Sequence, residues 1–270
     1  MNFDAKQLEV LCEEVIKCAR KAANFIREER TVFRYEKAEQ KGLNDLVSYV
    51  DRVAEDMLIQ ALKPLLPEAG FLVEENTLFV KNEYNWIIDP LDGTTNFVHG
   101  IPCYAVSIAL ERKGEVLLGV VHEVSRDECF SAVTGMGAFL NARPIGVSAR
   151  GKLSESLIAT GFPIYNFDRL NAYLNTLQHL MRHTQGIRRI GSAATDLCYL
   201  ACGRVDAFFE YNLNPWDVAA GACIVKEAGG LIEDFSAGQD WLYGKEICAG
   251  NPYLFSEFKS VIGQFMGAKF

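Results

Sequence analysis

The segment from Trp86 to Phe97 combines an apolar run with a dense set of oxygen donors. The apolar run Trp86–Ile88 is followed by two carboxylates, a glycine and a hydroxyl, in the order Asp89, Pro90, Leu91, Asp92, Gly93, Thr94. Glycine lets the backbone approach a ligand closely, and the proline restricts the turn that we expect between the two acids. Carboxylate oxygens suit Mg²⁺, and backbone N–H groups at a helix start suit a phosphate. The segment therefore predicts a site that holds Mg²⁺ and a phosphate together.

Two further acidic segments could complete such a site. Glu74 follows the apolar triplet Phe71–Val73, and Asp217 stands just before an Ala-rich helical run. If these acids gather with Asp89 and Asp92, each like-charged pair at ~4 Å costs on the order of 4 kcal/mol at an effective dielectric constant of about 20. Without cations, some of the carboxylates would have to take up protons or move apart. Two or more divalent ions would neutralise the negative charge of the pocket. That the fold brings these four acids together is a hypothesis.

Together these segments resemble the inositol monophosphatase family. Asp89–Phe97 is similar to the family signature Asp-Pro-x-Asp-Gly-Thr-x-Asn-Phe, and Trp216–Gly221 is similar to its Trp-Asp-x-Ala-Ala-Gly signature. Further segments fit in family order, from about residue 40 to about residue 230: Asp45–Asp51, Phe71–Glu75, Gly135–Asn141 and Gly191–Ala194. Ser48 stands where the family usually has threonine, and Val73 stands where it usually has glycine, which makes the local backbone before Glu74 a point of departure.

The resemblance implies an α+β fold, layered α/β/α/β/α as in the inositol monophosphatases and fructose-1,6-bisphosphatases. Runs of strands and helices, instead of strict alternation, favour the same class. A break near residue 145 would separate an N-terminal half, residues 1–145, from a C-terminal half, residues 146–270. The first half would carry most metal ligands and the second would complete the substrate pocket, within one compact unit.

The resemblance also implies a role for each candidate residue. Two or three Mg²⁺ ions would be bound by Glu74, Asp89, the carbonyl of Leu91, Asp92 and Asp217. The catalytic residues would be Glu74, Thr94 and Asp51, of which Thr94 and Asp51 hold the attacking water. The substrate would contact Asp92, Gly93, Thr94, Gly191, Ser192, Ala193, Glu210 and Asp217. Lys41 could correspond to a lysine that positions a further metal or phosphate.

The expected reaction is the Mg²⁺-dependent hydrolysis of a phosphate monoester, with myo-inositol monophosphate as the expected substrate. A carboxylate at Glu210 would favour a neutral polyol and repel a second phosphate. Substrates of related enzymes are the alternatives: 3′-phosphoadenosine 5′-phosphate, fructose 1,6-bisphosphate or NADP. Asn214 stands where histidine is frequent in the family, which leaves selectivity open.

Other classes of protein remain as alternatives. A haloacid dehalogenase phosphatase uses the first aspartate of Asp-x-Asp-Gly-Thr as its nucleophile, but here Pro90 and Leu91 separate the acids and the motif lies far from the start of the chain. A non-catalytic binding or regulatory subunit could keep the pocket, although each predicted side-chain ligand is an acid. The basic stretch Arg182–Arg189 could bind additional phosphates, or it could be a solvated loop or a subunit contact.

Composition narrows the class of protein further. The chain has 270 residues, of which 49% are hydrophobic and 23% charged, which favours a substantial core over disorder. A net charge of −8 disfavours nucleic acid and anionic membrane as partners. No apolar run approaches the ~20 residues of a membrane-spanning helix. Eight scattered cysteines and a charged, amphipathic N-terminus predict reduced thiols in a cytoplasmic protein. The family resemblance adds a homodimer and inhibition by lithium.

The elements that must position these residues follow from hydrophobic periodicity. Helices are predicted over residues 4–29, 48–66, 169–181, 193–202 and 216–228. Strands are predicted over residues 70–74, 84–88, 186–190 and 205–210, with a meander over 104–112, 115–122, 128–133 and 138–140. Residues 154–160 are expected to start the second half. Lys41–Asn44 is predicted to be a polar turn.

Overall fold

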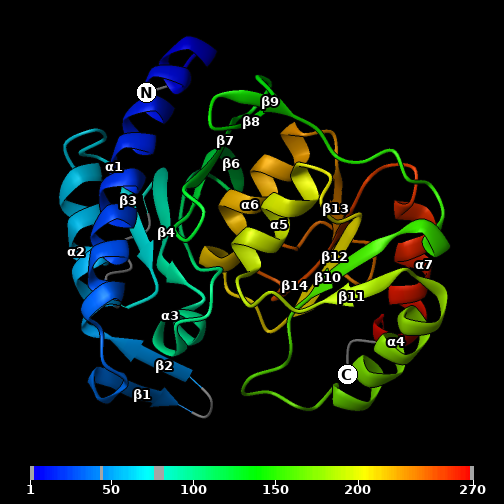
Figure 1. Cartoon of the computed structure of the whole chain (residues 1–270). Coiled ribbons are helices and arrows are strands. Elements are labelled where there is room, and N and C mark those ends of the chain that lie inside the picture. Colours follow the sequence, from blue (N-terminus) through cyan, green and yellow to red (C-terminus); the bar gives the residue numbers. More distant parts are fainter. Residues whose placement is uncertain (1–2, 43–44, 76–81, 268–270) are drawn as a thin grey trace.

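The computed structural model describes residues 3–42, 45–75 and 82–267 of the chain. Helices and sheets alternate across the molecule, with one helix pair outside each sheet and a third pair between the sheets (Figure 1). The helices are α1 (Ala5–Val32), α2 (Tyr49–Leu62), α3 (Thr94–His99), α4 (Leu170–His183), α5 (Ala193–Ala201), α6 (Pro215–Glu227) and α7 (Phe255–Met266). From one side to the other, the layers are α1/α2, a seven-stranded sheet, α5/α6, a five-stranded sheet and α4/α7. This arrangement confirms the predicted α/β/α/β/α layering.

The seven-stranded sheet contains the predicted meander. Its order is β3 (Gly70–Val73), β4 (Tyr84–Asp92), β5 (Ala105–Arg112), β6 (Glu115–Glu123), β7 (Glu128–Val133), β8 (Ala138–Leu140) and β9 (Arg143–Ile145). β3 runs parallel to β4, and each later strand pairs antiparallel with its predecessor. Along β4, Trp86 and Ile88 pack in the core under α1 and α2, whereas Ile87 packs on the opposite face with α5 and α6. Helices cover both faces, so β4 is apolar throughout instead of alternating.

The five-stranded sheet lies in the C-terminal part of the chain. Its order is β11 (Gly186–Arg188), β10 (Leu157–Thr160), β12 (Ala207–Tyr211), β14 (Glu246–Gly250) and β13 (Leu231–Glu233). β10 is parallel to β11 and β12, while β14 is antiparallel to both of its neighbours. Strands β13 and β14 and helix α7 were not predicted. The chain leaves the first sheet at Ile145 and enters the second at Leu157. The division into two halves near residue 145 stays a prediction.

Strand β4 differs from its prediction in a way that matters for the site. It was expected to end at Ile88 and to open into a turn, but it continues to Asp92. Its register with β5 shifts between Asp89 and Asp92, which marks a bulge. Pro90 lacks an N–H group and is tolerated in a sheet at such an irregularity. The turn prediction was wrong because a bulged strand and a turn share the same local residues.

The N-terminal segment shows two further differences. Helix α2 ends at Leu62 instead of Leu66, because Pro64 has no N–H to continue the helical hydrogen bonds. β1 (Ala38–Gly42) and β2 (Asp45–Ser48) form an antiparallel hairpin that was not predicted. The expected turn at Lys41–Asn44 falls within this hairpin, where residues 43–44 and the side chain of Lys41 lie outside the described part. No helix in the described residues is both long and apolar enough to cross a membrane.

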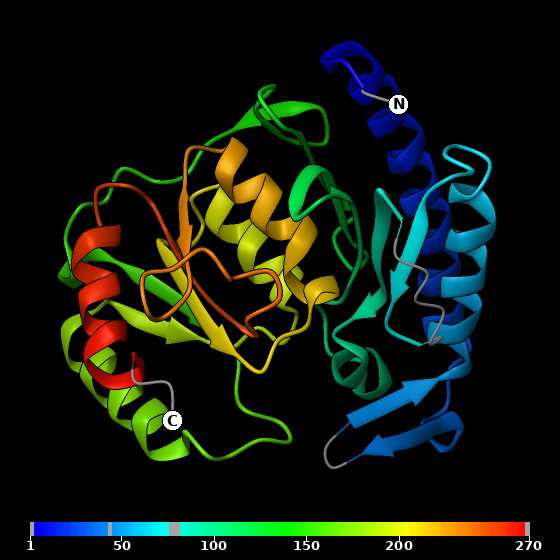
Figure 2. The same cartoon turned by 180° about the vertical axis from the view of Figure 1, so that it is seen from behind.

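Helices α5 and α6 lie side by side between the two sheets (Figure 2). All nine residues of α5 are buried. A Cβ atom at Gly119 of β6 would lie 2.5 Å from the carbonyl oxygen of Ala220 in α6, and one at Gly221 would lie 2.7 Å from Cβ of Leu197 in α5. These glycines allow α6 to pack against both the first sheet and α5. This packing fixes the position of the first turn of α6.

The first prediction concerns this contact. Gly119→Ala places a methyl group against the α6 backbone, and overpacking of this kind typically costs about 1–3 kcal/mol. We expect a lower free energy of unfolding, measured by urea denaturation. Gly146→Ala is the matched control, because the nearest atom to its Cβ would be 3.7 Å away, an ordinary contact. Equal stability of the two variants would show that α6 is not held this closely.

Candidate active site

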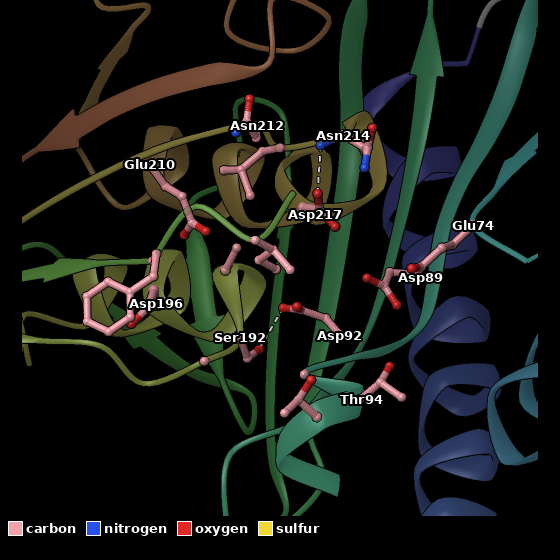
Figure 3. Close-up of a pocket in the computed structure, with 18 of the residues that line it drawn as sticks. Glu74, Asp89, Asp92, Thr94, Ser192, Asp196, Glu210, Asn212, Asn214 and Asp217 are labelled. Carbon is pink, nitrogen blue, oxygen red and sulfur yellow. Dashed lines mark hydrogen bonds between the residues drawn. The ribbon is translucent and has the colours of Figure 1, made fainter. Parts of the chain in front are cut away.

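A cavity of about 170 Å³ opens where β3 and β4 face the ends of β12, α5 and α6. The predicted site residues that line it are Glu74, Asp89, Leu91, Asp92, Gly93, Thr94, Gly191, Ser192, Ala193, Glu210 and Asp217. Figure 3 shows Glu74, Asp89, Asp92 and Asp217 directed toward a common space. The structure therefore brings together residues that are up to 143 positions apart in the sequence, from Glu74 to Asp217. Asp51, which does not line the cavity, reaches it through Thr94.

Asp89 lies at the centre of the acidic group. It is 2% exposed, and its Oδ1 accepts a hydrogen bond of 2.9 Å from the N–H of Leu91 across the β4 bulge. Burial raises the pKa of Asp89 well above its ordinary value, and the negative charges of Glu74, Asp92 and Asp217 raise it further. These four acids are thus close enough to repel one another, as the sequence hypothesis required.

Asp92 connects the two sheets. Its Oδ2 accepts hydrogen bonds from Oγ of Ser192 at 2.6 Å and from the N–H of Ala194 at 2.8 Å, both at the start of α5. Burial raises the pKa of Asp92 to about 6, and the Ser192 and Ala194 donors oppose that rise. The carboxylate is therefore held by donors from the other half of the fold.

Thr94 and Asp51 form the hydrogen-bonded pair that the family resemblance implied. Oγ1 of Thr94 lies 2.8 Å from Oδ1 of Asp51 and 3.0 Å from the carbonyl oxygen of Leu91. Oδ2 of Asp51 accepts from both N and Oγ of Ser48, at 2.8 and 2.7 Å. Burial raises the pKa of Asp51, and the hydroxyls of Ser48 and Thr94 oppose the rise. Ser48 also caps α2 by accepting from the N–H of Val50, so serine performs here the role expected of threonine.

Three helices begin at the cavity. α3 follows Gly93, whose φ of +95° suits glycine, α5 follows Ser192, and α6 begins at Pro215 after Asn214. Oδ2 of Asp217 accepts a hydrogen bond of 2.6 Å from the N–H of Asn214. The N-terminal ends of helices carry unpaired N–H groups and partial positive charge, which offset neighbouring carboxylates and attract anions.

Glu210 occupies the cavity beside Gly161. A Cβ atom at Gly161 would lie within 2.3 Å of both carboxylate oxygens of Glu210, so this glycine leaves the room that the carboxyl group fills. Burial raises the pKa of Glu210 to about 8, Asp92 contributes to the rise, and the positive charge of Arg189 opposes it. Glu210 therefore faces the cavity, as expected, instead of standing at a solvated strand end.

The donors fit a hard cation in kind. Glu74, Asp89, Asp92 and Asp217 offer carboxylate oxygens and Leu91 offers a carbonyl oxygen, a set that suits Mg²⁺ better than zinc. Among the described residues, however, no three acidic, imidazole or thiol groups already form a cluster tight enough to hold a metal ion. Carboxylates that repel one another are expected to stay apart until a cation draws them together.

Some residues at the cavity were missed by sequence reasoning. Nδ2 of Asn96 donates to the carbonyl oxygens of Cys103 and Ile190, at 2.8 and 2.9 Å, and so ties together loops from both halves. Asn96 belongs to the Asp-Gly-Thr-x-Asn-Phe signature, so the motif could have indicated it. Gly161 and Asp196 carried no such signal. Within the basic stretch Arg182–Arg189, Arg189 lines the cavity.

The fold and the acidic cavity are those expected of a phosphatase of the layered α/β/α/β/α type. The chain belongs to the inositol monophosphatase family, whose sequence model matches residues 7–262. The chain is 46% identical to the putative Nus factor SuhB of Neisseria meningitidis serogroup B, with 84% of this chain and 87% of that protein covered. It is 44% identical to inositol-1-monophosphatase of Mesorhizobium japonicum, over 79% of this chain and 81% of that protein.

Comparison with solved structures gives the same family. The crystal structure of the extragenic suppressor protein suhB from Bartonella henselae superposes with a TM-score of 0.88 at 40% identity, and the match covers 93% of this chain and 97% of that chain. The fold expected from the sequence is therefore shown.

The second prediction follows from the raised pKa values. In the folded chain the pKa of Asp92 is about 6 and the pKa of Glu210 is about 8, so each group keeps its proton up to that pH. In the unfolded chain both groups release their protons near pH 4. The folded state then binds more protons, so in this window the contribution of these groups to stability falls as the pH rises. Mg²⁺ needs ionised ligands, so its stabilising effect should grow over the same window.

Thermal unfolding with and without Mg²⁺ at pH 5.5 and pH 8 measures this effect. We expect a larger Mg²⁺-induced rise in melting temperature at pH 8. In Asp92→Asn, one titrating acid is removed, so the pH dependence should be smaller. A Mg²⁺ effect that is identical at both pH values would contradict the expected coupling between carboxylate ionisation and metal binding.

Proposed function

We propose that the chain catalyses the Mg²⁺-dependent hydrolysis of a phosphate monoester, and that its substrate is myo-inositol monophosphate. The observation that carries this proposal is the convergence of four acids with three helix N-termini on one cavity. The acids would hold cations, and the N–H groups would hold the oxygens of a phosphate. Such a combination suits a phosphate ester better than a neutral ligand.

In this proposal, Glu74, Asp89, the carbonyl of Leu91, Asp92 and Asp217 hold two or three Mg²⁺ ions. When bound, Mg²⁺ would supply a more acidic water and compensation for the negative charge that grows in phosphoryl transfer. Gly93 and Thr94, at the start of α3, and Gly191, Ser192 and Ala193, before and within the first turn of α5, would position the substrate.

Thr94 would act on the attacking water. Oγ1 carries one proton, for which Oδ1 of Asp51 at 2.8 Å and the carbonyl oxygen of Leu91 at 3.0 Å are the acceptors, so its lone pairs remain available to accept a hydrogen bond from water. Such a bond orients the water and makes its oxygen a better nucleophile. Glu74, which also lines the cavity, is the second group that could accept a proton from this water.

The leaving-group side of the cavity supports a polyol. Glu210 is half-buried there, and its carboxyl group, with a pKa raised to about 8, can form hydrogen bonds with ring hydroxyls. Arg189 lines the same region, where the negative charge of Asp92 offsets its positive charge. We therefore favour an inositol monophosphate over a bisphosphate such as 3′-phosphoadenosine 5′-phosphate, fructose 1,6-bisphosphate or NADP.

The proposal extends to the properties that membership of the family implies. We expect a cytoplasmic homodimer that is inhibited by lithium, since Li⁺ could displace one Mg²⁺. Lys41 keeps its proposed role at a further metal or phosphate, although its side chain is outside the described residues.

The third prediction tests the reaction directly. Asp92→Asn removes one charge from the acidic group and one of its metal-ligand oxygens, so Mg²⁺-dependent phosphate release should fall by at least about 100-fold. Asp168→Asn makes the same change at an exposed position away from the cavity and should retain activity. The assay is phosphate release with Mg²⁺ and with a chelator.

The substrate is tested with the same assay on a panel of myo-inositol monophosphate and the three bisphosphates. Faster turnover of any bisphosphate would contradict the polyol assignment. Trapping of a phosphorylated Asp89 would instead favour the haloacid dehalogenase mechanism, in which the protein itself is the nucleophile.

A second candidate role comes from the relatives. The Neisseria meningitidis protein, 46% identical over 84% of this chain, is named a putative Nus factor. A Nus factor role would make this chain a binding protein, the non-catalytic class considered above.

The fourth prediction separates the two roles by replacing the Neisseria protein in its host with this chain. If the binding role is correct, the Asp92→Asn variant of this chain should replace the Neisseria protein as well as the wild-type chain does. Failure of both versions to replace it would remove this candidate.

A further inference from the structure

Asp196 has no part in the reaction proposed above, yet it lines the same cavity. It lies in the first turn of α5 and is 1% exposed. Its Oδ1 is buried and has no hydrogen-bond partner among the described residues. Buried polar atoms nearly always have a partner, so an unpartnered oxygen at a cavity indicates a group that a ligand completes.

Helix capping does not account for this carboxyl group. Ser192 caps α5, and its Oγ accepts the N–H of Thr195 at 3.2 Å. Asp196 is one residue beyond the position at which an acid would return a hydrogen bond to the cap. An ion pair does not account for it either, since Arg189 affects the pKa of Asp196 but forms no ion pair with it within the described residues.

Asp196 is a neighbour of Glu210 on the side of the cavity away from Glu74 and Asp89. Figure 3 shows Glu210 and Asp196 on one side and Glu74 and Asp89 on the other. Burial, with the charges of Glu210 and Asp92, raises the pKa of Asp196 well above its ordinary value, which favours the neutral carboxyl group. A neutral carboxyl group both donates and accepts hydrogen bonds, and a hydroxyl group does the same.

We propose that Asp196 is a second specificity-determining residue, whose carboxyl group together with that of Glu210 binds neighbouring hydroxyl groups of a polyol phosphate. This inference rests on the proposed function, because it concerns the leaving group of that reaction. It assigns Asp196 no part in holding the metal or the phosphate. A substrate without hydroxyl groups therefore gains nothing from Asp196.

The experiment compares two substrates in Asp196→Ala and Asp196→Asn. Myo-inositol 1-phosphate carries hydroxyl groups beside its ester, whereas 4-nitrophenyl phosphate carries none. In Asp196→Ala, the KM for inositol phosphate should rise about tenfold, the effect of one or two lost hydrogen bonds, while kcat changes less than about twofold. The kcat/KM for 4-nitrophenyl phosphate should stay unchanged. Asp196→Asn keeps a donor and an acceptor, so it should restore most of the affinity.

Two further variants complete the design. Asp168→Ala removes an exposed carboxylate away from the cavity and should change neither substrate. Asp196→Leu fills a similar volume without polar atoms and replaces the alanine variant if that variant does not fold. The circular dichroism spectrum and melting temperature of each variant show whether it is folded.

The outcomes separate this inference from the proposed function. If the wild type hydrolyses inositol phosphate but Asp196→Ala or Asp196→Leu affects neither substrate, or affects both equally, Asp196 is structural and the inference is overturned. If the wild type itself hydrolyses 4-nitrophenyl phosphate but not inositol phosphate, the polyol assignment fails, and the inference fails with it. A selective loss on inositol phosphate with rescue by asparagine supports the proposal.

Discussion

Repulsion among four carboxylates, of which Asp89 is buried and Glu74, Asp92 and Asp217 are half-buried, is the constraint to which the rest of this structure responds. Asp89 is surrounded by the charges of Glu74, Asp92 and Asp217 in a place where water contributes little screening. The fold offsets part of this cost with directed donors: α5 supplies two to Asp92, and the N–H of Asn214 supplies one to Asp217. The remaining cost is a reason for a cation to bind here.

The same hydrogen-bond donors couple folding to formation of the site. Asp92 belongs to the first sheet but is held by α5, and Asn96 bonds to the carbonyl oxygen of Ile190 in the second half. Helix α6, which places Asp217, is in turn fixed by its close approach to Gly119 of β6. The cavity therefore exists only when both sheets have packed around the central helix pair. A change in that packing should move ligands that are distant in sequence.

In the proposed reaction, the two sides of the cavity would serve different chemistry. Glu74, Asp89 and the Asp51–Thr94 pair lie where a cation and a water would be handled, while Glu210 and Asp196 lie where the alcohol would leave. Inositol-1-monophosphatase of Mesorhizobium japonicum and the SuhB proteins share this family and fold. The presence of all four acids, Glu74, Asp89, Asp92 and Asp217, at the cavity supports a catalytic role, which a purely binding function would not require.

The sequence by itself determined the locally encoded features of this protein: the long helix α1, the meander from β5 to β8, and the motif from Asp89 to Thr94 that indicated metal and phosphate. Hydrophobic periodicity and short turns depend on residues that are near one another in the chain, so they can be read from it. Only the tertiary structure decided that β4 continues through Pro90 as a bulge, that short strands such as β13 complete a sheet, and that Gly161 makes room for Glu210. It also brought Asp196 to Glu210 and left Oδ1 of Asp196 without a hydrogen-bond partner among the described residues. Burial and pairing of this kind depend on contacts between distant segments, and those contacts exist only after both sheets pack.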